Sequence, residues 1–233
     1  MTNKVVIDRL IVRSQGEQDA ILDFNRGLNV ITGPSDSGKS YVLDLLDFMF
    51  GASKLRRRIP EIEAYNYVIL QLTFIGDDPG HVSIARNING GAYELREGHV
   101  ETVGSADEPR RLSATHNPRN LDNLSNYLLD KIGLAGSMVR RNLRNQTRSL
   151  SFRDLAHLSL IDETSMQSAV SPVTPTGQYT TRTVEESVFS LLLEGEDDSG
   201  LSESPPLQRR SVYQIRGRGS LIALLRYWRI SRR

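Results

Sequence analysis

The sequence predicts a mixed α/β fold with α+β character, and two stretches carry this prediction. In the first, a short apolar run at residues 27–32 enters a glycine-bounded loop, and an apolar pattern with helical spacing follows at residues 39–50. A strand, loop and helix in this order are typical of α/β proteins. In the second, strand-like segments within residues 67–103 alternate with Gly-bearing turns, which is typical of an antiparallel meander. We therefore expect an α/β lobe joined to an antiparallel β subdomain.

The first fifty residues contain the clearest elements. Apolar patterns predict strands at residues 5–12 and 20–24, separated by a polar turn. A third strand is expected at residues 28–32, where the apolar run indicates burial. The helix that follows, at residues 39–50, is closed by a glycine.

Further elements are expected along the rest of the chain. Residues 104–119 are polar and predicted to be irregular, and residues 135–150 are basic with no clear pattern. Ser151 can cap a helix, with Asp154 at the third position in the manner of a capping box. The elements expected are strands at residues 67–75, 81–86, 92–96 and 100–103, and helices at residues 121–132, 151–158 and 183–193.

The loop before the first helix fits the pattern G-x-x-x-x-G-K-[ST] of P-loop NTPases. Its backbone N–H groups lie at a helix N-terminus, where free donors and the positive end of the helix dipole favour an anion. We expect Lys39 to reach the β- and γ-phosphates of ATP and the Ser40 hydroxyl to be a ligand of Mg²⁺. The predicted nucleotide-binding residues are Gly33, Pro34, Ser35, Asp36, Ser37, Gly38, Lys39 and Ser40.

Composition limits the classes of function. The chain has no cysteine, which excludes disulfides, zinc–thiolate sites and cysteine nucleophiles. No apolar run is long enough to span a membrane and the first residues do not resemble a signal peptide, so we expect a cytoplasmic protein. The four histidines, at positions 81, 99, 116 and 157, show no metal-ligand spacing, and we expect His157 to be a core residue.

The net charge of +1 conceals an uneven distribution of charge. Residues 1–206 carry 21 Lys and Arg against 28 Asp and Glu, a net charge of −7, whereas residues 207–233 hold eight arginines and no acid. We divide the chain into an ATPase lobe at residues 1–165, a loop and helix extension at residues 166–203, and a basic tail at residues 204–233. The tail could be a basic amphipathic helix. We favour the hypothesis that it is frame-shifted sequence at the end of a truncated chain.

Residues 5–52 resemble the N-terminal lobe of the SMC/SbcC-type coiled-coil ATPases, which are relatives of the ABC transporter heads. The shared pattern is strand, turn, strand, G-L-N-V-I-T-G-P-x-x-S-G-K-S, helix and F-x-F-G. The resemblance implies ATP and Mg²⁺ as cofactors, and closure of the site by a C-terminal lobe or by a second head. It also implies an arginine loop close to nucleotide or DNA, at Arg56–Arg58. Asp36 replaces the glycine usual in the loop, and an acid there would weaken anion binding.

Residues 158–167 admit three interpretations. The resemblance places the family's Q-loop about this far from the phosphate loop, with Gln167 among the candidates. The run Leu-Ser-Leu-Ile-Asp-Glu also imitates a Walker B strand, in which Asp162 would hold Mg²⁺ and Glu163 would orient water. The third interpretation is an ordinary capped helix with exposed acids. Asp162 and Glu163 are the candidate catalytic residues.

These observations lead to two functional hypotheses. The first is an ATP-binding lobe with an SMC/SbcC-like role in DNA repair, chromosome maintenance or defence against phage, which hydrolyses ATP when a partner completes the site. No L-S-G-G signature accompanies the phosphate loop. The second hypothesis is therefore a non-catalytic nucleotide-binding module. A self-contained P-loop kinase or GTPase is a weaker alternative, because two strands precede the loop strand and no N-K-x-D motif is present.

Overall fold

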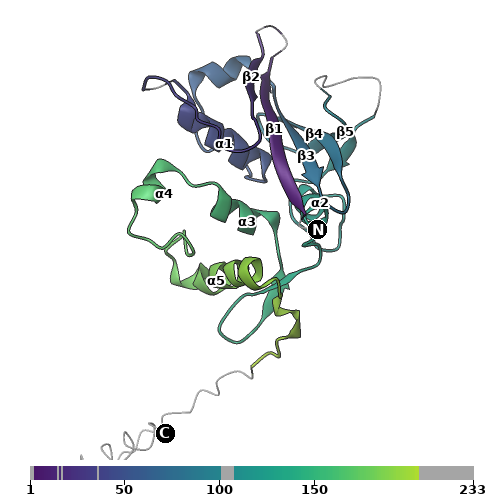
Figure 1. Ribbon diagram of the computed structural model, residues 1–233, viewed down its shortest axis with the longest axis vertical. Coiled ribbons are helices and arrows are strands. Elements are labelled where there is room, and N and C mark those ends of the chain that lie inside the picture. Colours follow the sequence, from purple (N-terminus) through teal and green to yellow (C-terminus); the bar gives the residue numbers. More distant parts are fainter. Residues whose placement is uncertain (1–2, 15, 17, 36, 101–107, 205–233) are drawn as a thin grey trace, which may run out of the picture.

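The computed structural model describes residues 3–204, apart from residues 15, 17, 36 and 101–107. Its centre is a six-stranded sheet with the strand order β2-β1-β3-β4-β5-β6, in which each neighbouring pair is antiparallel (Figure 1). A separate hairpin of β7 and β8 lies beside α5. The strands are β1 (Lys4–Arg13), β2 (Ala20–Asp23), β3 (Tyr67–Ile75), β4 (Gly80–Asn87), β5 (Tyr93–Glu97), β6 (Arg110–Leu112), β7 (Met138–Arg140) and β8 (Thr147–Ser149).

Within the described residues five α-helices accompany the sheet, so the predicted mixture of helices with an antiparallel sheet is confirmed. Side chains alternate along β3 between the main core, which includes α1, and a small cluster on the outer face of the sheet. Both faces of β3 are therefore buried. The helices are α1 (Lys39–Met49), α2 (Leu124–Lys131), α3 (Phe152–Ser159), α4 (Glu163–Gln167) and α5 (Tyr179–Glu194), with 3₁₀ turns η1 (Pro60–Ala64) and η2 (Asp198–Gly200).

The predicted cap of α3 is present as a complete capping box. The Ser151 side chain accepts from the helix backbone, and the Asp154 side chain accepts from the Ser151 N–H at 2.9 Å. Arg148 binds both oxygens of the same carboxylate, at 2.9 and 2.8 Å. The box and this bidentate contact fix the start of α3 against β8.

The prediction of a buried strand at residues 28–32 is wrong. Leu28 is 90% exposed and Val30 is 72% exposed, and the segment forms no strand. Asn29 instead bonds through its side chain to the backbone N–H and C=O of Asn25, both at 2.8 Å. An isolated strand leaves its backbone donors and acceptors unpaired, and no strand within the described ranges lies beside this segment.

Other sequence expectations meet mixed outcomes. The strand predicted at residues 100–103 falls mostly outside the described residues, and Val100 belongs to no strand. The stretch at residues 104–119, expected to be irregular, contains β6. The proposed boundary at residue 165 stays a prediction, although Val188 and Leu191 of α5 are buried in the same core as the sheet. The basic tail lies outside the described residues from position 205 onward.

A buried arginine joins the sheet to the end of α1. Arg86 on β4 is 1% exposed, and its guanidinium lies 4.0 Å from the ring centroid of Phe48 and 4.5 Å from that of Tyr93. It donates to the carbonyl oxygens of Phe48 at 2.8 Å and Ala52 at 2.6 Å. Free carbonyls at a helix C-terminus carry partial negative charge, which offsets the buried cation.

No helix among the residues placed in the structure combines the length and the apolar character needed to cross a membrane.

Candidate functional site

The glycine-rich loop delivers its backbone N–H groups to the start of α1. Gly38 adopts a φ of 81°, in the left-handed region that favours glycine, and α1 begins at the next residue. Among the described residues no side chain caps α1, and its first turn contains no acid. The starts of three other helices are capped, by Asn123 in α2, Ser151 in α3 and Asp162 in α4. The N-terminus of α1 is thus left with free donors, which is the condition for binding an anion.

Lys39 folds back over the loop that it follows. Its Nζ donates to the carbonyl of Gly33 at 2.9 Å and to the Ser37 hydroxyl at 3.2 Å, and it also contacts the carbonyl of Pro34. These neutral oxygens hold the ammonium against the loop. A Cβ on Gly33 would lie 2.8 Å from the Ser37 Oγ, so a larger residue there would require the Ser37 side chain to move. Asp36 lies outside the described residues, and its effect on anion binding stays a prediction.

The three arginines after α1 each bind a different segment. Arg57 donates to Asp44 at 2.6 Å and to the backbone carbonyl of Ser40 at 3.2 Å, which places its guanidinium beside the start of α1. Arg56 donates to Asp162 at 2.6 Å, across 106 residues of sequence. Arg58 donates to Asn89, also at 2.6 Å. The basic run is exposed, as a solvated face would be, yet each arginine is held in position.

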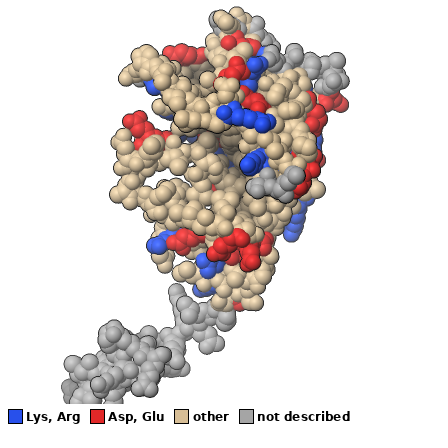
Figure 2. Space-filling model, viewed as in Figure 1, with Lys and Arg blue, Asp and Glu red and all other residues tan. Residues whose placement is uncertain are grey.

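The loop lies between two cavities. One, of about 650 Å³, is bordered by the loop from Ser37 to Tyr41 and by Arg57. The other, of about 540 Å³, separates α1 from α3 and α4, and Figure 2 shows the surface hollowed there. Both volumes lie within the range of small-ligand and cofactor sites.

The second cavity gathers residues that are far apart in sequence. Ser40, Asp44 and Asp47 line it from α1, and Asp162 and Glu163 line it from the start of α4. The sequence analysis missed Asp44 and Asp47. Their spacing of four and seven residues from Ser40 puts all three on one helical face, and this signal could have found them.

Comparison with known proteins defines the family. A family model described as "AAA domain" matches residues 12–165, well over half of the 233 residues. The chain belongs to the AAA domain family. This assignment supports a P-loop ATPase fold and nucleotide binding, usually with Mg²⁺. No curated protein matches the sequence.

The AAA domain match includes the loop, α1 and the acidic pair at positions 162 and 163. Asp162 caps α4 by accepting from the Ser165 N–H at 2.8 Å and also accepts from Arg56. Glu163 is exposed and accepts from Gln167 at 3.4 Å. Residues 160–162 form no strand, so the Walker B strand interpretation is wrong. The Q-loop interpretation stays a prediction.

Hydrogen bonds to Ser165, with Arg56 beside the carboxylate, lower the pKa of Asp162 to about 2. Since the pKa in the folded protein lies below the ordinary value near 3.8, ionised Asp162 stabilises the fold fully above about pH 4. This contribution is lost as pH falls through 2. We expect the Asp162 carboxyl resonance to titrate near pH 2 in an NMR experiment. The Arg56→Ala variant should move the midpoint of this titration upward. An ordinary midpoint near 3.8 in the parent chain would contradict the hydrogen bonds of Asp162 with Ser165 and Arg56.

The histidines depart from the sequence expectations. His157 is exposed on α3, so its prediction as a core residue is wrong. His116 is partly buried and its Nε2 lies 2.9 Å from the Ser149 hydroxyl; burial lowers the pKa of His116. His81 and His99 lie against each other on the sheet, although their sequence spacing gave no sign of a shared site.

Proposed function

We propose that this AAA domain binds ATP with Mg²⁺ through Gly33–Ser40. The observation that carries the proposal is the uncapped N-terminus of α1, with Lys39 folded over the loop in front of it. Phosphate oxygens would accept from the free N–H groups, and Lys39 would exchange its contacts with neutral carbonyls for contacts with phosphate. Charge-assisted hydrogen bonds are about twice as strong as neutral ones, so phosphate would be the preferred partner.

The residues that line the cavity beside α1 fit a hydrated Mg²⁺. The ion prefers oxygen ligands and keeps several of its waters, and when bound it stabilises charge on the phosphates. Ser40 would supply a direct ligand. Asp162 and Glu163, which line the facing wall, would accept hydrogen bonds from water in the same cavity. Arg57 supplies positive charge close to Ser40.

We further propose that a second component completes the site, as in SMC/SbcC-like proteins. The apolar segment at residues 28–31 leads directly into the phosphate loop and is exposed, which suits pairing with a strand of a complementary C-terminal lobe or a second head. A role in DNA repair, chromosome maintenance or defence against phage would follow from that arrangement, with DNA as a possible partner. The hydrolytic activity would then depend on assembly.

The test is to measure ATP binding, and ATP turnover over a range of protein concentrations, with and without DNA. ATP binding that requires Mg²⁺, with turnover that rises more steeply than the protein concentration, would support a completed ATPase. Binding without turnover at any concentration would favour the alternative, a non-catalytic nucleotide-binding module. A chain that binds no ATP would overturn the proposal.

The exposed apolar segment at residues 28–31 offers a separate prediction. Val30→Asp should change the free energy of unfolding of the isolated chain by less than about 0.5 kcal/mol, because the side chain is already 72% exposed. It should nevertheless remove the concentration-dependent step, whether turnover or self-association, because a buried charge would oppose pairing. Chemical denaturation and analytical ultracentrifugation measure the two effects. Leu121→Asp, at a side chain 73% exposed on another segment, is the matched control and should leave assembly unchanged.

A further inference from the structure

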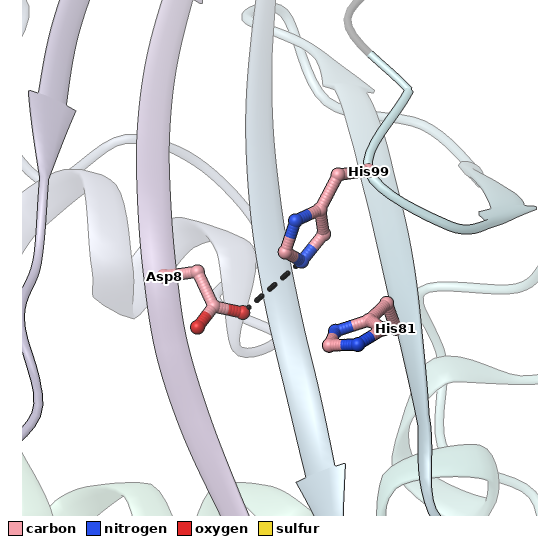
Figure 3. Close-up of side chains that lie close together, drawn as sticks. All are labelled: Asp8, His81 and His99. Atoms are coloured by element: carbon pink, nitrogen blue, oxygen red, sulfur yellow. Dashed lines mark hydrogen bonds and ion pairs between the residues drawn. The ribbon is translucent and has the colours of Figure 1, made fainter.

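Asp8, His81 and His99 come together on the outer face of the sheet, away from the nucleotide loop (Figure 3). One ligand atom of each lies within 4.8 Å of those of the other two. The Nε2 of His99 is 3.2 Å from the Oδ2 of Asp8, and the centroids of the two imidazole rings are 4.8 Å apart. These are three side chains of the kinds that bind first-row transition metals.

Asp8 lies at a β-bulge on this face. Ile7 pairs with Leu72 and Arg9 pairs with Gln71, so Asp8 is the extra residue of β1 and has no partner across the ladder. The Phe24 N–H donates to the Asp8 carbonyl at 2.8 Å and fixes the bulge from the other side. Ile7 packs on the core beside Leu72, so alternation directs the next side chain, Asp8, to the outer face.

A fixed loop brings His99 over β4. The N–H of Gly98 donates to the His81 carbonyl at 2.7 Å. Ser83 then holds the loop on both sides of His99, donating to the Gly98 carbonyl at 2.8 Å and accepting from the Val100 N–H at 2.7 Å. The imidazole of His99 is thereby placed beside that of His81 before any ion binds.

Thr73 orients two of the three candidate ligands. Its hydroxyl donates to Asp8 at 2.6 Å and lies 2.8 Å from the Nδ1 of His81. Because the single hydroxyl proton goes to the carboxylate, His81 donates its Nδ1 proton to Thr73 and keeps a lone pair on Nε2. A histidine that ligates a metal through one nitrogen commonly donates a hydrogen bond from the other.

We propose that Asp8, His81 and His99 bind a divalent transition-metal ion, with Zn²⁺ as the best fit. Tetrahedral Zn²⁺ with bonds of 2.0–2.1 Å holds adjacent ligands about 3.3 Å apart, close to the spacing of His99 and Asp8. Small rotations of the His81 ring would complete a three-ligand site with a water in the fourth position. Mg²⁺ is disfavoured because it prefers oxygen ligands. The ion would join β1, β4 and the loop after β5, which are distant in sequence.

The test uses the full chain, freed of any histidine tag and stripped of metal by chelation. We expect Zn²⁺ to bind at one equivalent by calorimetry and to raise the melting temperature. Co²⁺ should give the visible absorption of a tetrahedral site, and Mg²⁺ should not compete. His99→Ala and Asp8→Asn should abolish the cobalt band. Thr73→Val should weaken Zn²⁺ binding by roughly 10- to 100-fold, as removal of an orienting partner does.

Two controls separate this site from other effects. His157→Ala removes an exposed histidine elsewhere and should retain full binding of Zn²⁺. Lys39→Ala should also retain it, so failure of the nucleotide proposal would leave the metal result unaffected. The His99→Ala change lies in an exposed loop, and circular dichroism would verify its fold. Equal Zn²⁺ binding by His99→Ala and the parent, or no cobalt band in the parent, would overturn the proposal.

Discussion

Replacement of Lys39 by alanine should weaken ATP binding by roughly 10- to 100-fold, because charge-assisted hydrogen bonds contribute about 1.5–3 kcal/mol. The fold should be unaffected. Apart from the carbonyls of Gly33 and Pro34 and the Ser37 hydroxyl, no hydrogen-bond partner of the ammonium is found among the described residues, and all three belong to the loop itself. Calorimetry with ATP and Mg²⁺ measures the affinity, and a melting curve without nucleotide checks the fold.

Lys54→Ala is the matched control for this experiment. Lys54 is an exposed lysine after α1, and it lines neither of the cavities beside the loop. Salt screens interactions between exposed charges beyond about 8–10 Å, so ATP affinity should be unchanged at physiological ionic strength. Equal loss in both variants would indicate a general charge effect. Parent-like affinity in Lys39→Ala would remove the loop from the nucleotide site.

The elements that the sequence predicted correctly depend on neighbours in the chain. The start of α1 needs a glycine at position 38 for its positive φ, followed by apolar residues at helical spacing. The cap of α3 needs only Ser151 and Asp154, three residues apart. Residues this close together in the sequence are enough to predict such elements. The strand β3 was likewise predicted with the bounds that it has in the structure, Tyr67–Ile75.

The features that the sequence did not predict depend on distant partners. An apolar run such as residues 28–32 becomes a strand only beside another strand, and its composition says nothing of whether one is there. The contact of Arg56 with Asp162 spans 106 residues, and that of Asp8 with His99 spans 91. The latter also depends on the loop after β5, which Ser83 holds over β4 through contacts that leave no signature in the sequence.

Arg86 is another such case, and it carries the largest expected effect on stability. Alternation along β4 places this charged side chain on the core face with Val82 and Ile84, where an apolar residue would be expected. We expect Arg86→Ala to lower the free energy of unfolding by about 3–5 kcal/mol, from the cavity between two rings and from carbonyls left without partners. Urea denaturation with an unchanged m-value would measure it.

Two further variants divide this loss into its causes. Arg86→Met fills most of the space but donates no hydrogen bond, so its cost isolates the carbonyl contacts at Ala52 and Gly91. Tyr93→Phe removes the hydroxyl that donates to the Phe48 carbonyl at 3.0 Å, and should cost only about 1 kcal/mol because Arg86 still bonds that oxygen. A stable Arg86→Met protein would show that packing, rather than hydrogen bonding, holds α1 to the sheet.

The position of Arg86 also links stability to the nucleotide site. Its guanidinium binds the C-terminal end of α1, and the same helix presents the phosphate loop at its N-terminal end. Loosening this end should change the direction of the free N–H groups at the other end, because α1 would be held less firmly against the sheet. We therefore expect Arg86→Ala, assayed well below its melting temperature, to bind ATP more weakly than the parent but more tightly than Lys39→Ala. Parent-like affinity in Arg86→Ala would mean that the loop is held by its own contacts.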